Sequence, residues 1–180
     1  MKRYDEAMTL KRLFVPLIFS LTVLFTLTSV QAAERKSLGG YRDWEAYRVT
    51  ENGKKVCYVA SLPRKMVGKY KKRGDVVAFV THRPAHKERD VVSFVAGYAF
   101  KKGSSVEVAI DGRKFSLFTK DDTAWARSEA AERAIVKAMI KGKRMAVRGT
   151  SSRGTRTTDT YSLLGFTRAY KKINQACGVK

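Results

Sequence analysis

The sequence predicts a mostly β, single-domain protein of the β-sandwich class with two short helices. Alternating or β-branched runs recur along the 180-residue chain, and turn residues separate them at the spacing typical of a sandwich. Helical spacing occurs in only two places, at about 128–141 and 167–177. No Pro- or Ser-rich linker interrupts the chain, so we expect one domain, spanning residues 41–180.

About nine strands account for the β content. The main ones are expected at 41–49, 56–60, 76–80, 91–100, 106–110, 114–118, 145–147 and 160–166. The strongest hairpin signal is Asp111-Gly112, because glycine tolerates the positive φ that a tight turn between twisted strands requires. The connections 64–74, 82–90 and 149–158 are polar and basic, and we interpret them as loops.

The two helices are predicted from the spacing of their apolar residues and from their ends. In residues 128–140 small and apolar side chains share one face, and Gly142 is a suitable stop. From Thr167 onward the apolar residues again fall on one face, as far as Cys177. We expect Thr167 to be the N-cap of this second helix.

The N-terminal region has the features of a secretory signal peptide. Basic residues precede an apolar run over 13–30, and small residues then lead to a cleavage site after Ala32. The 18-residue run also reaches the lower limit for a membrane anchor, but its hydroxyl content and the cleavage site favour removal. Residues 1–32 are therefore predicted to be a signal peptide and 33–40 a flexible lead. Export places the protein in the periplasm and leaves surface association or secretion open.

Export changes how the charge and the cysteines are interpreted. The whole chain carries +21, and removing four basic and two acidic side chains with residues 1–32 leaves +19 on the folded domain. In an oxidising compartment Cys57 and Cys177 are expected to form a disulfide rather than a metal or redox site. A closed loop of about 120 residues would stabilise the fold by roughly 4–5 kcal/mol.

The two histidines offer a possible metal pair. His82 and His86 are four residues apart, but Pro84 disfavours a helix between them and no cysteine is near. We interpret both as loop histidines on a basic surface, and we predict no metal ligands and no cofactor.

Three acidic residues are candidates for catalysis. Asp121 and Asp122 could form a paired acid/base site, but they fit better as a turn before the helix at 128, where acids favour the helix dipole. Asp159 is expected to pair with Arg148, Arg153 or Arg156. Residues 149–154 resemble a phosphate loop only weakly, and there is no nucleophile elbow. We therefore predict no catalytic residues.

Clustered basic residues are the strongest functional signal. Those chosen as candidate anion-binding residues are Arg64, Lys65, Lys69, Lys71, Lys72, Arg73, Arg148, Arg153 and Arg156. A strongly positive exported domain attracts anionic envelope polymers, headgroups or host glycans over a long range, and salt weakens that attraction. The alternative is a soluble surface with no designed site. Nucleic acid is not an expected partner in vivo, because export removes the protein from it.

Several stretches together carry a resemblance to a known family. They are 95–98 (VAGY), 110–112 (IDG), Phe115, 117–118 (LF), 122–126 (DTAWA), 138–139 (AM) and 149–165, which contains RGTRTTDTYSL. In these stretches the chain resembles the invasion-associated locus B family of exported α-proteobacterial proteins, from about Trp44 to Cys177. Many members carry a cysteine shortly after the first Trp, whereas residues 45–48 here read Glu-Ala-Tyr-Arg, which leaves only the long disulfide.

The resemblance implies a β-sandwich in the periplasm or envelope, a role in host-cell entry in pathogenic members, and no assigned catalytic activity. We therefore expect a non-enzymatic protein that interacts with anionic envelope or host-surface components. The alternatives are an accessory factor that stabilises outer-membrane components under stress, and an envelope hydrolase with a site near Asp122 or Asp159. Aromatic residues alternating in strands usually pack in cores, so a set of them is assigned to the core. These are Trp44, Tyr98, Phe100, Phe115, Phe118, Trp125, Tyr161 and Phe166.

Overall fold

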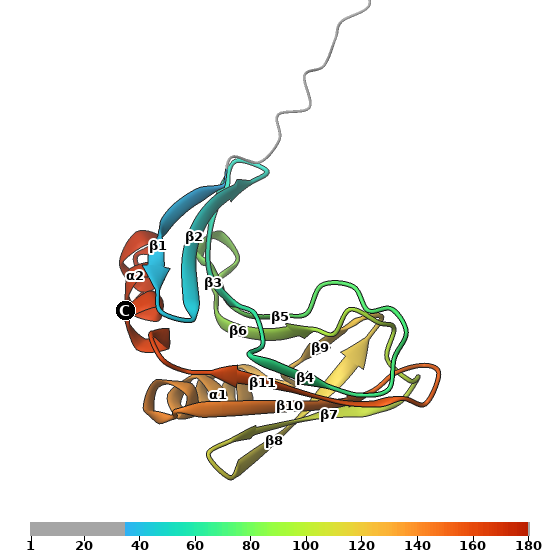
Figure 1. The fold of residues 1–180 in the computed structure, drawn as a ribbon. Helices are drawn as coiled ribbons and strands as arrows, with labels where there is room; N and C mark the ends of the chain where they lie inside the picture. The colour runs from blue at the N-terminus through green and yellow to red at the C-terminus, as the bar shows by residue number, and fades with distance from the viewer. Residues whose placement is uncertain (1–34, 180) are drawn as a thin grey trace, which may run out of the picture. The chain divides into compact units, whose positions relative to one another are not determined.

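Eleven strands and two α-helices make up residues 35–179, the part of the chain that the computed structural model describes (Figure 1). The strands are β1 (Lys36–Tyr41), β2 (Trp44–Glu51), β3 (Lys54–Ser61), β4 (Lys65–Val67), β5 (Val77–Arg83), β6 (Glu88–Val95), β7 (Ser105–Ile110), β8 (Arg113–Lys120), β9 (Thr123–Trp125), β10 (Arg144–Thr150) and β11 (Arg156–Ser162). The helices are α1 (Glu129–Lys141) and α2 (Phe166–Cys177), and a single 3₁₀ turn, η1 (Pro84–His86), joins β5 to β6. The predicted signal peptide and its cleavage after Ala32 lie outside the described residues.

All the strands belong to one antiparallel sheet, in the order β1-β2-β3-β5-β6-β9-β8-β7-β10-β11-β4. The sheet curls over its own inner face. The rings of Phe94 on β6 and Tyr161 on β11 lie 6.3 Å apart, although four strands separate β6 from β11 in the pairing order. The predicted mostly β class is confirmed, and the two layers that enclose the core are halves of a single sheet.

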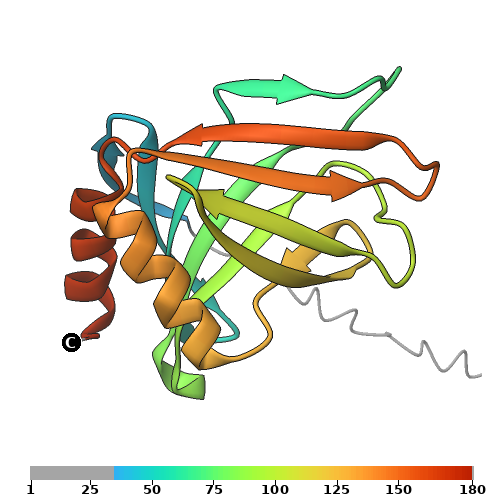
Figure 2. The same ribbon diagram turned by 90° about the horizontal axis from the view of Figure 1, so that it is seen from below.

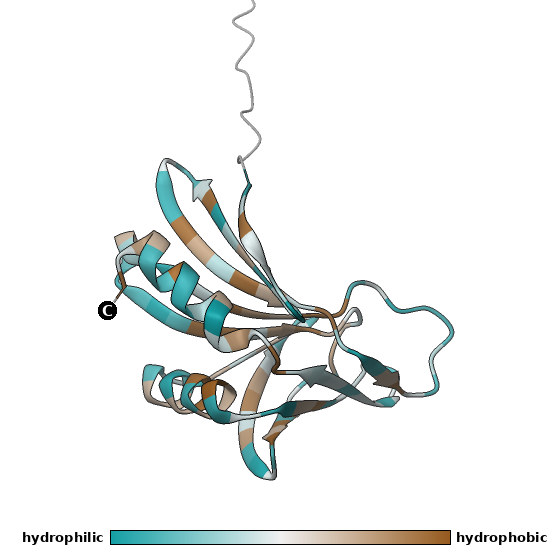
Figure 3. Cartoon of the chain, turned by 60° about the vertical axis from the view of Figure 1, so that its left-hand side comes forward, coloured by the Kyte–Doolittle hydropathy of each residue, from teal (hydrophilic) through white to brown (hydrophobic). Residues whose placement is uncertain are grey.

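The core fills the space between these two halves and under the helices. Trp44, Leu117, Met145 and Phe166 have no exposed surface, and the Trp44 and Phe166 rings meet edge to face at 4.9 Å. Hydrophobic and hydrophilic positions alternate along the strands and around the helices (Figure 3), as expected for elements that bury one face.

The predicted range of α1 agrees with the structure. Ser128 is its N-cap, and the Ser128 Oγ accepts the N–H of Ala131, which satisfies one of the free donors of the first turn. Gly142 ends the helix, and its N–H donates to the carbonyl oxygen of Ala138. A Cβ at position 142 would lie 2.7 Å from the Ile110 side chain, so a larger residue would not fit there.

Helix α2 begins one residue before the predicted start, and the predicted N-cap is wrong. Gly165 occupies that position with φ 92°, and a Cβ there would lie 1.7 Å from the carbonyl oxygen of Tyr41. Thr167 is already inside the helix. Its Oγ1 donates instead to the carbonyl oxygen of Ile140 at 3.1 Å, which links the start of α2 to the end of α1.

The predicted disulfide is present. Cys57 on β3 and Cys177 at the end of α2 are bonded, with their Cα atoms 6.0 Å apart. Helix α2 packs against β2 and β3, and Figure 2 shows both helices on the same side of the sheet. The disulfide therefore attaches α2 covalently to the β2–β3 hairpin.

The prediction of a flexible lead over 33–40 is wrong for residues 36–40, which belong to β1. This strand pairs antiparallel with β2, with Lys36 opposite Arg48 and Tyr41 opposite Trp44. Arg42 makes the tight turn between them with φ 62°. The short strands β4 and β9 were likewise not predicted.

One buried carboxyl group couples the stability of α1 to pH. Glu132 lies under the helix against β6 and is 9% exposed. Burial raises the pKa of Glu132 to about 7, and the negative charges of Asp90, Glu129 and Glu88 add to this rise. The folded state therefore holds a proton on Glu132 more tightly than the unfolded chain, whose ordinary value is 4.5.

We expect Glu132→Gln to remove this pH dependence. Because the folded pKa is raised, protonated Glu132 stabilises the fold fully below pH 4.5, and that contribution is lost as pH rises through about 7. At pH 8 the glutamine variant should be more stable than the parent by about 2 kcal/mol, and near pH 5 the two should differ little. Urea unfolding at both pH values measures the effect. Asp75→Asn, at an exposed position before β5 and not among the charges that act on Glu132, is the control, and equal pH profiles for the two variants would contradict the prediction.

Candidate functional site

A basic and hydroxyl-rich surface covers the outer side of β8, β7, β10, β11 and β4. Alternate residues of a strand point to opposite faces. On β10 Met145 and Val147 are buried, which turns Arg144 and Arg148 outward, and on β11 the burial of Asp159 turns the neighbouring threonines outward. We call this surface the basic face. Its members are Lys65, Lys114, Arg144, Arg148, Arg156, Thr158 and Thr160.

Strand register sets the positions of these side chains relative to one another. One cross-strand row runs Lys65, Thr160, Ala146, Ala109 and Lys114, from β4 to β8. The next row contains Val67, Thr158, Arg148, Glu107 and Ser116. Neighbouring strands lie about 4.8 Å apart, so each row places cations and hydroxyl groups within reach of a single extended ligand.

Two shallow depressions follow these rows. The first, of about 600 Å³, is lined by Arg144, Arg148, Lys114, Thr158 and Thr160 among others. The second, of about 430 Å³, adjoins the β10–β11 turn and gathers Lys101 and Lys102 with Arg156. Both are open to solvent, which suits a polymer or a surface better than an enclosed small molecule.

Two acidic side chains, Glu107 and Asp111, line the first depression and reduce its positive charge. Glu107 accepts hydrogen bonds from Arg148 Nη1 at 2.7 Å and lies 3.1 Å from Lys114 Nζ. The hydrogen bond and charge of Lys114, followed by those of Arg148, lower the pKa of the exposed Glu107. Five cations against these two carboxylates leave the basic face positive.

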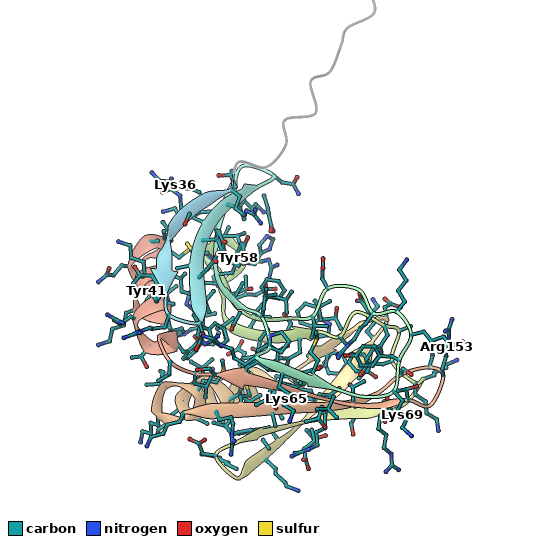
Figure 4. All side chains as sticks on the ribbon, viewed as in Figure 1. Lys36, Tyr41, Tyr58, Lys65, Lys69 and Arg153 are labelled. Atoms are coloured by element: carbon teal, nitrogen blue, oxygen red, sulfur yellow. A yellow bond between two sulfur atoms is a disulfide. The ribbon has the colours of Figure 1, made fainter. Side chains whose placement is uncertain are left out.

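Eight of the nine candidate anion-binding residues fall into three groups in the structure. Lys65, Arg148 and Arg156 share the basic face. Lys69, Lys71 and Lys72 are exposed in the segment after β4, and Arg153 is exposed in the β10–β11 turn; Figure 4 shows Lys69 and Arg153 reaching solvent. Arg64 lies elsewhere, where it pairs with Asp43.

Arg73 was predicted to bind anions at the surface, and that prediction is wrong. Its side chain is 4% exposed and forms a two-point ion pair with Asp159, including Nη1 to Oδ1 at 2.7 Å. The Nε atom donates to the carbonyl oxygen of Ala96 at 2.6 Å, and the guanidinium lies between the rings of Tyr70 and Tyr98 at 5.2 and 5.0 Å. Burial alone would lower the pKa of Arg73, but the hydrogen bonds and charge of Asp159 raise it above its ordinary value. We call this cluster the Arg73 clamp.

The predicted ion-pair partners of Asp159 are also wrong. None of Arg148, Arg153 and Arg156 pairs with it; the residue that does is 86 positions earlier in the chain. The clamp thereby holds the basic segment after β4 against β11.

His82 does not lie in a surface loop as predicted. It is fully buried on β5, where its Nδ1 accepts the N–H of Asp90 at 3.0 Å and its Nε2–H donates to Asn174 Oδ1 at 2.7 Å. Tyr170 donates to the Asp90 carboxylate at 2.5 Å. Burial lowers the pKa of His82, so the ring stays neutral and connects β5 to α2. His86 is exposed in η1, as expected.

The aromatic residues assigned to the core split into two sets. Trp44, Phe100, Tyr161 and Phe166 are buried, and Tyr98 and Phe115 pack against the core while partly exposed. Phe118 and Trp125 lie instead on the outer side of β8 and β9, half-exposed, so their assignment to the core is wrong.

Two cations of the basic face, Arg144 and Lys114, are not among the candidate anion-binding residues chosen from the sequence, although Arg144 belongs to a basic run with Lys141 and Lys143. The sequence does contain a signal for Arg144. It lies four residues before Arg148 on a strand whose intervening residues are apolar, and residues an even number of positions apart on a strand point to the same face. Lys114 has no such signal, because it reaches the basic face only through the pairing of β7 with β8.

The fold and this face define a small, strongly basic β protein closed by a disulfide. Within residues 35–179 no helix is long and apolar enough to cross a membrane. The same residues contain no group of three or more His, Cys, Asp or Glu side chains that could hold a metal ion.

Comparison with known proteins places this chain in a family. The family model described as "Invasion associated locus B (IalB) protein" matches residues 44–174, and the chain therefore belongs to the invasion associated locus B family. Among solved structures it is similar to the invasion associated protein B from Bartonella henselae, with a TM-score of 0.52 and 14% sequence identity over 78% of this chain and 96% of that one. At this identity the likeness establishes the fold. No curated protein matches the chain.

Proposed function

We propose that this protein is a non-enzymatic envelope factor that binds anionic polymers of the cell envelope or of a host surface through the basic face. The observation that carries this proposal is the cross-strand arrangement of five cations and two threonines around only two carboxylates. Membership of a family named for invasion supports an envelope role.

The geometry favours an extended ligand with repeated negative charges. Arginine side chains bind phosphate, sulfate or carboxylate groups in a two-point manner, and threonine hydroxyl groups donate further hydrogen bonds. A flat sheet face cannot enclose a small ligand, but it can contact several units of a polymer at once. Long-range attraction by the positive domain would also speed association.

The two carboxylates that could serve a hydrolase, Asp122 and Asp159, have other interactions in the structure. Asp159 is held in the Arg73 clamp, and Asp122 is exposed and accepts a hydrogen bond from Thr123 Oγ1. Neither arrangement provides a general acid or base beside a bound substrate. This supports the non-enzymatic proposal.

Retention on heparin, a polyanion without an acyl chain, tests this function. We expect affinity to fall by about tenfold or more between about 50 and 200 mM salt, since several ion pairs with a polyanion release counterions. Ala146→Glu, which adds a carboxylate to the centre of the basic face, should abolish most of the retention. Ala60→Glu is the matched control, at an equally half-exposed alanine on the opposite half of the sheet. Flat affinity across salt, or equal loss in both variants, would contradict the proposal.

A further inference from the structure

A second surface of different chemistry lies on the other half of the sheet. The outer side of β2, β3, β5, β6 and β9 carries partly exposed aromatic and aliphatic side chains, whereas the inner side of β2, β3 and β5 packs against α2. Two depressions, of about 540 and 240 Å³, share Tyr58 and Phe79 and so form one continuous groove. We call this the aromatic groove.

Strand pairing builds the floor and walls of the groove. Tyr47 lies opposite Tyr58, with their rings stacked at 5.2 Å, and Phe79 meets Tyr58 edge to face at 5.9 Å. Ala60, opposite Phe79, leaves the floor open because its side chain is small. The groove crosses five strands, which corresponds to a length of about 20 Å.

Apolar side chains continue beyond the aromatic centre. Leu62, which is 68% exposed, and Val77 line the wider end, and Val95 and Trp125 line the narrower end. The narrower end also carries hydroxyl groups and the paired Arg83 and Glu51, so the apolar surface is centred on Tyr58 and Phe79. Exposed apolar surface in a groove favours binding of an apolar group.

The wider end is rimmed by positive charge. Arg35, Arg42 and Arg64 all border it, and the Arg35 guanidinium lies 5.2 Å from the centre of the Tyr47 ring. The two carboxylates of this end have partners, since Arg64 donates to Asp43 and the Tyr47 hydroxyl donates to Glu45.

Two of the rim arginines are free to meet an anion. Within residues 35–179, Arg35 and Arg42 form no ion pair with a carboxylate. The groove thus combines an elongated apolar floor with available guanidinium groups at one end only.

We propose that the aromatic groove binds a single anionic membrane lipid, with its acyl chain along Tyr58 and Phe79 and its phosphate at Arg35 and Arg42. An elongated apolar floor with cations at one end complements an amphiphile that has a negatively charged head. Because Arg35 and Arg42 have no ion-pair partner in the described part of the chain, whereas both carboxylates of the wider end have partners, the rim favours an anionic head over a cationic or neutral one. This site is separate from the basic face and does not depend on the polymer binding proposed there.

Calorimetric titration of the protein with dodecyl phosphate, kept below its micelle concentration, tests the proposal. We expect saturable one-to-one binding that is about tenfold or more tighter than that of dodecyl maltoside, which has a similar chain and a neutral head. Inorganic phosphate alone should give no saturable binding in this range. Equal affinity for the maltoside, or binding of inorganic phosphate as tight as that of dodecyl phosphate, would overturn the proposal.

Variants locate the site. Ala60→Glu places a carboxylate on the floor and should weaken dodecyl phosphate binding by about tenfold or more, and Arg35→Ala with Arg42→Ala should weaken it by about threefold to tenfold. Ala146→Glu, on the basic face, should leave it unchanged. Unchanged binding in Ala60→Glu, or an equal loss in Ala146→Glu, would overturn the proposal.

Two further controls keep the test decisive. If thermal unfolding shows that Ala60→Glu is not folded, Phe79→Thr serves as the second floor variant, since threonine is favourable in strands. The same two glutamate variants are scored on heparin retention. A protein that loses retention only in Ala146→Glu but never binds dodecyl phosphate would refute the lipid site and leave the proposed function standing.

Discussion

Replacing Arg73 with methionine is expected to lower the free energy of unfolding by about 3–5 kcal/mol. The reason is the Asp159 carboxylate, which is 5% exposed and has Arg73 as its ion-pair partner. Removing the guanidinium leaves a buried negative charge without compensation and frees the Ala96 carbonyl oxygen. Urea unfolding monitored by circular dichroism measures the loss.

A double variant separates the charge from the packing. Arg73→Met combined with Asp159→Leu removes both charges, and we expect it to recover much of the stability lost by the single change. Arg153→Met, at an exposed position of the β10–β11 turn, is the matched control and should change stability by about 0.5 kcal/mol or less. If Arg73→Met behaves like Arg153→Met, the clamp does not stabilise the fold.

Loss of the disulfide is expected to destabilise the protein by about 4–5 kcal/mol. Cys57 and Cys177 close a loop with a sequence separation of 120, and cutting it restores chain entropy to the unfolded state. Both residues are buried, so Cys57→Ala with Cys177→Ala removes the bond while keeping small apolar side chains in the core.

The measurement is the urea midpoint of the double alanine variant and of the parent protein, each with and without reductant. The parent should move to the midpoint of the variant when it is reduced, and the variant should not respond. A reduced parent that keeps its oxidised midpoint would show that α2 is held by packing alone, through buried residues such as Ala169 and Ile173.

Local patterns in the sequence predicted most of the elements. The helices follow from apolar spacing, and Ser128 and Gly142 mark the ends of α1. The β7–β8 hairpin follows from Asp111-Gly112, both of which adopt positive φ. The strand β1 was missed because its Ser-Leu-Gly-Gly core has little β propensity, and its pairing with β2 decides its conformation.

The site was predicted less well, because it depends on long-range register. Arg73 looks like one cation in a basic run, and nothing in its neighbourhood indicates a partner 86 residues away. His82 had a local signal, since it continues the alternation of Ala78 and Val80 on one face of β5. The basic face itself emerged only when β4, β11, β10 and β7 were placed side by side.

The pairing order of the sheet has a consequence for how the chain acquires its fold. Strand β4, early in the sequence, forms the far edge of the sheet by pairing with β11, as Met66 does with Asp159 about 90 residues later. Such a non-local topology is slow to form. The sheet cannot be completed while the chain emerges from its N-terminal end, because β4 has no partner until β11 has also emerged. A chain truncated before β11 should therefore remain sensitive to protease, and even under oxidising conditions its Cys57 cannot form the native disulfide, because Cys177 is absent.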